Sequence, residues 1–297
     1  MADVIATDQK GMRMGVHIIV DSAADYTVEE AAAKNLRIVP LKTIFGDVEY
    51  ADGIDLAGER FYEKLVESDV LPHTSQVTPF EFASALGEVP AGDEAVVITL
   101  SSKISGTHES ACAAAADPAL AGRVFVVDSE SATIGERLLV ERACALRGEG
   151  LSASAIAAAL EDERRDIRVI AVLDTLEYLK RGGRVSAAAA AIGGALSIKP
   201  VIGLVDGEVA VLGKARGSKQ GGNLLRKRVA ETGVDWGRPV HLGYTGLSDA
   251  LLRKYVEDSR DLFEAHRDQI DVSIVGSTIG THVGPGAIAL AYFAPRG

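Results

Sequence analysis

Hydroxyl-rich and glycine-rich turns, and not clusters of charged groups, follow the short apolar runs of this chain. Four such segments are 21–25 (DSAAD), 74–76 (TSQ), 101–107 (SSKISGT) and 281–286 (THVGPG). In open α/β sheets, ligands bind at the carboxyl ends of the strands. Hydroxyls and free backbone N–H groups at such a point, next to the positive end of a helix dipole, favour a carboxylate or a phosphate. These residue types therefore predict an anion-binding site made of turns.

Each of these side chains also has a structural interpretation. Ser102 or Ser105 is well placed to cap the helix that follows it. Capping is also the interpretation that we prefer for Asp128 and Asp174, which follow predicted strands. His282 falls in a segment that its glycines predict to be a tight turn, where a histidine is often a satisfied surface group. Beside a carboxylate, the same imidazole could donate a hydrogen bond or transfer a proton.

Several enzyme motifs are missing from the sequence. The hydrolase elbow Gly-x-Ser-x-Gly has Lys103 where its first glycine should stand. There is no phosphate-binding P-loop and no His-Glu-x-x-His pair, and the first strand runs into Asp21 and Ser22 instead of a dinucleotide-binding turn. The two cysteines have neither a metal-ligand spacing nor the pattern of a disulfide framework. A Ser/His/Asp triad assembled from distant residues is the alternative that stays open.

A second candidate site is the basic segment 181–184 (RGGR). Its glycines suit the end of a helix predicted over 174–180, so the two arginines could simply be solvated. Arginine also binds planar anions through two parallel hydrogen bonds, which favours a phosphate or a docking partner. The next segment, Ser186 to Leu196, is almost entirely alanine, isoleucine and glycine. Such residues indicate either close helix packing or a narrow channel for an acyl chain.

Composition excludes some classes of protein. The chain has 297 residues, of which 47% are hydrophobic and 25% are charged, which is enough for a packed core. A formal net charge of −11 argues against nucleic-acid binding, because phosphate contacts require a basic surface. The sequence contains no apolar run long enough for a membrane span, and its first fifteen residues do not resemble a signal peptide. We therefore expect a cytoplasmic protein with at most transient contact to a membrane surface.

The elements that must position these turns alternate between strands and helices, which predicts an α/β fold. We expect an N-terminal domain over residues 16–165, with a mostly parallel sheet flanked by helices. A C-terminal α/β domain over 166–297 should contain a mixed sheet, because Asp206-Gly207 between two apolar runs predicts an antiparallel hairpin. Helices are expected at about 134–164 (two, broken near Gly148 and Gly150), 218–232 and 248–266.

Eight short segments, taken together, resemble the DegV family. Each alone is a weak signal, but all eight occur in the family's order, from about residue 17 to residue 293. They are 20–25 (VDSAAD), 74–76 (TSQ), 100–107 (LSSKISGT), 127–129 (VDS), 174–184 (DTLEYLKRGGR), 198–200 (IKP), 214–217 (KARG) and 281–286 (THVGPG). This chain departs mildly from the pattern, with Val77-Thr78-Pro79 after Gln76 and isoleucine at position 104. Neither departure removes a proposed polar contact.

The resemblance implies a two-domain EDD fold with a tunnel between the domains that holds one long-chain, palmitate-like fatty acid. It implies a lipid-binding protein without catalytic residues, metal or cofactor. Such a protein presents the carboxylate to a separate fatty acid kinase, which makes the acyl phosphate used in phospholipid metabolism. The alternative is a self-sufficient lipid hydrolase or acyltransferase that uses a serine and His282.

Site residues follow from the matching motifs. Thr74 and Ser105 are implied to bind the carboxylate, with help from the Gly106 N–H group and His282. The predicted ligand-binding residues are Thr74, Ser75, Ser101, Ser102, Ser105, Gly106 and His282, and the predicted partner-binding or phosphate-binding residues are Arg184 and Arg216. Acyl-chain length and saturation lie outside these motifs.

Overall fold

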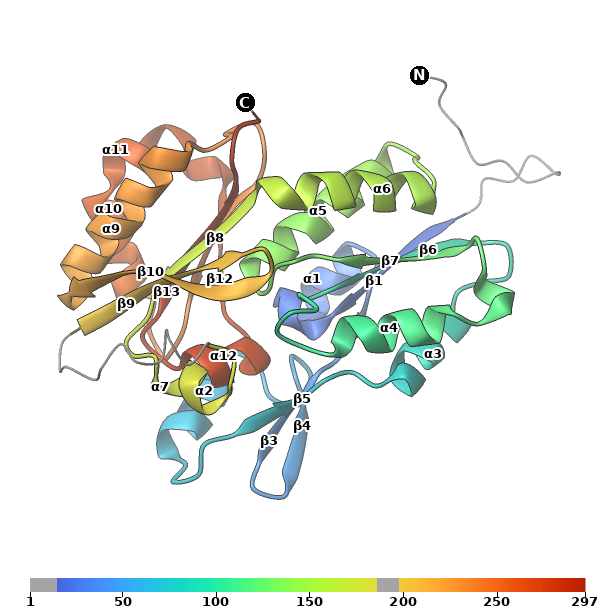
Figure 1. Cartoon of the computed structure of the whole chain (residues 1–297), viewed down its shortest axis with the longest axis horizontal. Helices are drawn as coiled ribbons and strands as arrows, with labels where there is room; N and C mark the ends of the chain where they lie inside the picture. The colour runs from blue at the N-terminus through green and yellow to red at the C-terminus, as the bar shows by residue number, and fades with distance from the viewer. Residues whose placement is uncertain (1–14, 186–197, 297) are drawn as a thin grey trace.

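Two sheets lie side by side in the computed structural model, which describes residues 15–185 and 198–296. The N-terminal half lies to the right in Figure 1 and the C-terminal half to the left. The segment Ser186 to Leu196, for which the sequence left helix packing or an acyl channel open, lies outside the described residues. The predicted α/β class, with a parallel and a mixed sheet, is confirmed.

The N-terminal half is built on a four-stranded parallel sheet in the order β2-β1-β6-β7. Its strands are β1 (Val16–Asp21), β2 (Leu36–Val39), β6 (Glu94–Thr99) and β7 (Val124–Asp128). The central strand β6 is buried along its whole length, as expected for a parallel strand that is covered on both faces. Asp21 and Asp128 therefore end their strands at the same edge of the sheet.

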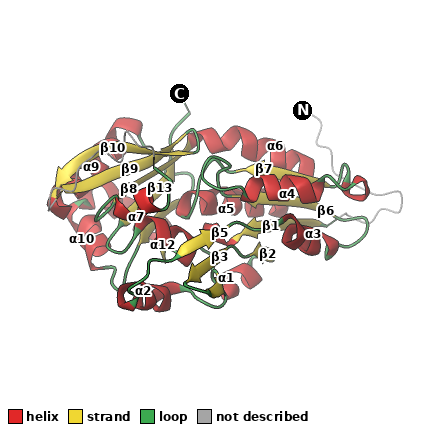
Figure 2. Ribbon diagram, turned by 60° about the horizontal axis from the view of Figure 1, so that its bottom comes forward, coloured by secondary structure: helices red, strands yellow, loops and turns green. Residues whose placement is uncertain are grey.

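Five helices flank this sheet (Figure 2). They are α1 (Val28–Ala33), α3 (Pro79–Gly87), α4 (Thr107–Ala115), α5 (Ile134–Gly148) and α6 (Ala153–Glu163). The predicted break between two helices near Gly148 and Gly150 is confirmed. Helix α5 packs against strands of both sheets, so it lies between the two halves of the molecule.

A small antiparallel sheet, not predicted from the sequence, lies below the junction of the two halves in Figure 1. It contains β3 (Lys42–Phe45), β4 (Val48–Ala51) and β5 (His73–Ser75), and α2 (Gly58–Glu67) follows β4. The sequence of residues 37–45 (RIVPLKTIF) favours extended chain throughout. The chain instead leaves the parallel sheet at Pro40, which has no N–H group for a ladder hydrogen bond, and β3 joins the small antiparallel sheet.

The C-terminal half is a six-stranded mixed sheet in the order β10-β9-β8-β13-β11-β12. Its strands are β8 (Ile167–Val172), β9 (Ile198–Val205), β10 (Glu208–Arg216), β11 (Val240–Tyr244), β12 (Ile270–Ile274) and β13 (Ile288–Phe293). The predicted hairpin is confirmed: Asp206 and Gly207 join β9 to β10, both with positive φ, of 51° and 80°.

One face of the mixed sheet is covered by α9 (Gly217–Thr232), α10 (Ala250–Asp258) and α11 (Arg260–Phe263). The single helix expected over 248–266 is wrong, because Ser259 leaves helical geometry and separates α10 from α11. The other face of the sheet turns towards α5 and the N-terminal half. None of the helices in the described part of the chain is both long and apolar enough to cross a membrane.

Two short helices fill the junction of the two halves, α7 (Glu177–Arg181) and α12 (Ser277–Val283), which pack against each other. The predicted turn around His282 is wrong: this residue lies in the last turn of α12, and the chain turns only afterwards, at Gly284. Helix α7 begins at Glu177, later than predicted, because Thr175 Oγ1 accepts a hydrogen bond from the Glu177 N–H.

Candidate functional site

A cavity of about 310 Å³ lies between the N-terminal half and the inner face of the mixed sheet. Apolar side chains from both halves line it. Leu41 and Leu100 come from the N-terminal half, and Ile202, Leu204 and Val209 come from β9 and β10. A volume of this size is at the lower end of the range for pockets that enclose a small ligand. The cavity therefore suits one slender apolar molecule.

The floor of the cavity is a row of small residues that runs across the mixed sheet. Ala171 in β8 is opposite Ala289 in β13, which is opposite Gly243 in β11. Directly opposite residues of antiparallel strands project to the same face of a sheet, and all three residues line the cavity. Ile202 in β9 extends the row on the other side of Ala171. We call Ala171, Ala289 and Gly243 the small-residue floor, because their short side chains leave the space open.

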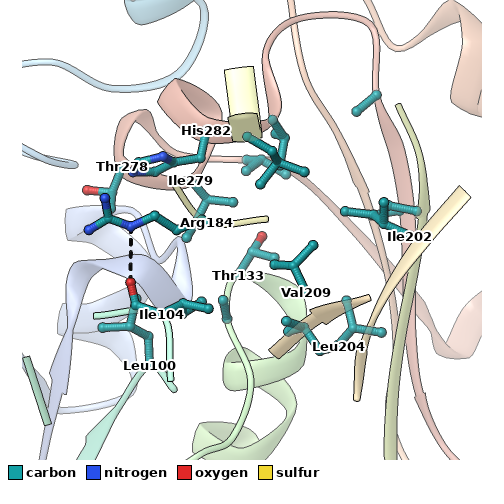
Figure 3. A pocket seen from close by; sticks show the side chains of 18 of the residues that line it. Leu100, Ile104, Thr133, Arg184, Ile202, Leu204, Val209, Thr278, Ile279 and His282 are labelled. Atoms are coloured by element: carbon teal, nitrogen blue, oxygen red, sulfur yellow. Dashed lines mark hydrogen bonds between the residues drawn. The ribbon is translucent and has the colours of Figure 1, made fainter. Parts of the chain in front are cut away.

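Polar groups gather at one end of the cavity. His282 Nε2 lies 2.9 Å from Thr74 Oγ1, which brings together residues 208 positions apart in the sequence. Thr74 is placed by β5, which pairs with β3, and His282 is placed by α12, which packs on both strands. Ser75 and Ser105 line the same cavity. In Figure 3, His282 and Arg184 lie on one side and Ile202, Leu204 and Val209 on the other.

The His282 imidazole is neutral near pH 7. Burial, and secondarily the nearby Arg184 guanidinium, lowers the pKa of this histidine to about 4. Within the described part of the chain, its Nδ1 atom has no hydrogen-bond partner. The ring is held closely on that side, since a Cβ atom at Gly182 would lie only 2.2 Å from Nδ1. Glycine at position 182 therefore serves the placement of His282 as well as the end of α7.

Arg184 adds a cation at this polar end. Its side chain lines the cavity, and its Nε donates to the backbone oxygen of Ile104 at 3.2 Å (Figure 3). The guanidinium also donates to the Gly182 backbone oxygen at 2.6 Å. These contacts leave the side chain exposed, so it bridges α7 to the loop before α4 at the surface of the protein. Arg216 is exposed at the end of β10 and is not among the residues that line the cavity.

Three other predicted ligand-binding residues lie beside the cavity instead of lining it. Ser101 is fully buried, and its hydroxyl donates to the Gly207 backbone oxygen at 2.8 Å. Ser102 donates its backbone N–H to the Asp128 carboxylate, and Gly106 is the N-cap residue of α4. The structure thus brings Thr74, Ser75, Ser105 and His282 together with Arg184 and leaves Ser101, Ser102 and Gly106 in supporting positions.

Sequence reasoning missed the small-residue floor and Thr133. Thr133 lines the cavity and has a φ of 51°, which is a strained value for a β-branched residue. Its hydroxyl donates to Asp25 Oδ2 at 2.5 Å. No motif marks these residues, because the floor depends on the alignment of three strands and the position of Thr133 depends on a loop before α5.

The fold and the site define an α/β protein that encloses an apolar cavity between two sheets, with hydroxyl groups and a neutral histidine at one end. The chain belongs to the DegV family, whose model, described as an uncharacterised protein of the DegV family, matches residues 15–295.

Relatives and solved structures agree with this membership. A DegV domain-containing protein of Caldanaerobacter subterraneus is 33% identical, over 93% of this chain and 98% of its own. A structure from Thermus thermophilus, described as fatty acid binding of a DegV family protein, has a TM-score of 0.81 and 31% identity, and the match covers 95% of this chain and all of that one. A stearic acid-binding protein from Eubacterium ventriosum has a TM-score of 0.81 and 25% identity, over 94% and 98% of the two chains.

Proposed function

We propose that this protein binds one long-chain fatty acid in the cavity and presents its carboxylate to a partner kinase. The observation that carries the proposal is the division of the cavity into an apolar part over the small-residue floor and a polar part at Thr74 and His282. A fatty acid matches this division, with an apolar acyl chain and a polar carboxylate. The fatty acid binding described for the Thermus thermophilus structure supports the proposal.

The apolar part supplies most of the binding free energy. Burial of one CH₂ group is worth about 0.8 kcal/mol, so a chain of palmitate length gains on the order of 10 kcal/mol before the costs of association are subtracted. Both halves of the molecule contribute apolar walls to the cavity, which removes the acyl chain from water. The binding of such a ligand needs no metal and no redox group.

The polar part orients the carboxylate. An unpartnered N–H in a buried site is less acceptable than an unpartnered lone pair. We therefore place the His282 proton on Nε2, from which it is donated to Thr74 Oγ1. The Thr74 O–H is then free to donate to the carboxylate, as is the Ser105 O–H. Arg184 adds a positive charge near the same point and offsets part of the cost of burying an anion.

Presentation to a kinase requires the carboxylate to lie near the surface. Arg184 lines the polar end of the cavity and its side chain is exposed, which supports a carboxylate position near the protein surface. In the proposed reaction a carboxylate oxygen attacks the γ-phosphorus of ATP, the bond to the bridging oxygen breaks, and ADP leaves. This chain supplies the bound nucleophile and a docking surface, and the separate kinase supplies ATP and the groups that bind it.

Two arginine variants separate binding from docking. Arg216→Ala should leave fatty acid affinity unchanged and lower the rate of acyl-phosphate formation by a partner kinase, because Arg216 is exposed and does not line the cavity. Arg184→Ala should lower both, because this side chain lines the polar end. Titration with labelled palmitate and a phosphorylation assay with kinase and ATP measure the two effects. Loss of palmitate binding in Arg216→Ala would show that Arg216 acts in ligand binding and not in docking of the kinase.

The hydrolase alternative makes a different prediction about His282. A serine hydrolase needs a serine hydroxyl within reach of its base. The hydroxyl that the His282 imidazole contacts is that of Thr74. We expect no turnover of long-chain esters without partner and ATP, and His282→Gln should slow acyl-phosphate formation while some fatty acid stays bound. Robust ester cleavage by the wild type that His282→Gln abolishes would establish the hydrolase instead.

A further inference from the structure

Three consecutive residues before and at the start of α12 are each hydrogen-bonded to a buried side chain of the N-terminal half. Tyr62 Oη donates to the Val275 backbone oxygen at 2.7 Å. The Gly276 N–H donates to Asp25 Oδ1 at 3.0 Å. The Ser277 N–H donates to Asp52 Oδ1 at 2.9 Å. Val275 is also bonded to the mixed sheet, through its N–H to the Tyr244 oxygen, so this segment connects the two halves.

Asp52 makes the largest number of these contacts. It is 1% exposed, and both of its oxygens accept hydrogen bonds. The Ser277 hydroxyl donates to Oδ1 at 2.6 Å, in addition to the Ser277 N–H, and the Ser22 hydroxyl donates to Oδ2 at 2.8 Å. The Ser277 hydroxyl also lies 2.9 Å from Thr43 Oγ1 in β3. The start of α12 is therefore bonded to three separate segments of the N-terminal half.

Asp25 binds α12 and the cavity wall at the same time. One oxygen accepts from Gly276 and the other from Thr133, the strained residue that lines the cavity. The approach is so close that a Cβ atom at Gly276 would lie 2.6 Å from Asp25 Oδ1. Burial raises the pKa of Asp25 to about 8, although the bond from Thr133 opposes the shift. The hydrogen bonds of Asp25 therefore require a buried position, which has a desolvation cost.

These contacts matter for the cavity because α12 forms one of its walls. Thr278, Ile279, His282 and Val283 all line the cavity and all belong to this seven-residue helix. A helix this short has little stability of its own. Its position depends on the contacts at its ends, which are the buried acids at the start and the Thr74 contact of His282 near the end.

We propose that Asp25, Asp52 and Tyr62 form an interdomain clasp that holds α12, and with it His282, against the N-terminal half, and that release of the ligand requires this clasp to loosen. The second part rests on the proposed function. The clasp residues are positioning residues, since they act on the cavity through α12. They do not form a metal site: no group of three or more His, Cys, Asp or Glu side chains among the described residues could hold an ion.

The test compares Asp52→Ala with a matched control, Glu136→Gln. Glu136 lies in α5, is fully buried and near Asp25, and within the described part of the chain its carboxyl oxygens have no hydrogen-bond partner. Hydrogen–deuterium exchange reports on the amides of residues 276–283. Transfer of labelled palmitate to phosphatidylcholine vesicles reports on release. Thermal unfolding shows that each variant is folded.

Asp52→Ala should speed both exchange in α12 and palmitate release by about tenfold or more, because it removes both hydrogen bonds that Ser277 donates to the Asp52 carboxyl group. Asp52→Asn should raise both rates less than Asp52→Ala does, since the asparagine side-chain oxygen still accepts a hydrogen bond from Ser277. Glu136→Gln should leave both rates unchanged. Should Asp52→Ala fail to fold, Ser277→Ala removes the side-chain bonds alone and carries the same expectation.

A folded variant with unchanged exchange in α12 would overturn the clasp. Faster exchange without faster release would overturn its role in release. A wild-type protein that binds no palmitate would refute the proposed function, while the exchange experiment on the ligand-free protein would still decide whether the clasp holds α12.

Discussion

Replacing Thr74 and Ser105 together by alanine should lower the affinity for palmitate by about tenfold or more while the protein stays folded. A hydrogen bond to a charged group contributes about 1.5–3 kcal/mol, and each 1.4 kcal/mol is about tenfold in affinity. Both hydroxyls line the polar end of the cavity. The Thr74 change also removes the hydroxyl that His282 Nε2 contacts at 2.9 Å. Titration of delipidated protein with labelled palmitate measures the effect.

Two controls sharpen this experiment. Thr74→Ser keeps a hydroxyl and should retain most of the affinity. Ser102→Ala makes the same change in the same loop as Ser105, but at a residue outside the cavity lining, and should have no effect. Equal losses in Ser102→Ala and Ser105→Ala would show that the loop, and not the Ser105 hydroxyl, is what matters. Unchanged affinity in the folded double variant would show that the carboxylate does not bind at the Thr74 end of the cavity.

Filling the small-residue floor should change which acyl chains are bound. Ala289→Leu adds three carbon atoms at the centre of the row formed with Ala171 and Gly243. If these atoms displace two to three CH₂ groups of the ligand, the longest chains lose about 2 kcal/mol. This loss corresponds to roughly thirtyfold in affinity. Competition between fatty acids of ten to eighteen carbons, read by mass spectrometry of the bound lipid, should show a shift to shorter chains.

A graded series controls for damage to the core. Ala289→Gly should keep the wild-type preference for long chains, and Ala289→Val should fall between the wild type and Ala289→Leu. Leu290 points to the opposite face of β13, where it packs in the core under α9 and α10, so Leu290→Met should leave the chain-length profile unchanged. A shift in that control equal to the shift in Ala289→Leu would mean that the cavity floor has been assigned to the wrong residues.

Local signals were enough to predict much of the fold. Apolar runs that end in Asp21 and Asp128 gave strands β1 and β7, and Asp206-Gly207 gave the hairpin, because each pattern acts within a few residues. The small sheet of β3, β4 and β5 was missed because its strands are short and pair across α2. The glycines after His282 suggested a turn, yet they follow the helix, whose start is fixed by Asp52 from 225 residues away.

The candidate site was predictable where a hydroxyl and a histidine carry the chemistry, as at Thr74, Ser105 and His282. The site was not predictable where side-chain packing alone brings residues to the cavity. Ala171, Ala289 and Gly243 are ordinary small residues until the registers of three strands align them. Ser101 looks like a ligand-binding hydroxyl in sequence, but its partner is the backbone of Gly207. Sequence can show which groups are available, whereas tertiary contacts decide which of them face the cavity.

Native mass spectrometry of the purified protein tests the central claim most directly, because it weighs the chain together with whatever the cavity holds. We expect one ligand per chain, with an added mass that matches a long-chain fatty acid and that is lost when the protein is denatured. Delipidated protein should take up one palmitate per chain. The account would be contradicted by a measured mass equal to that of the chain alone, together with no uptake of palmitate by the folded protein.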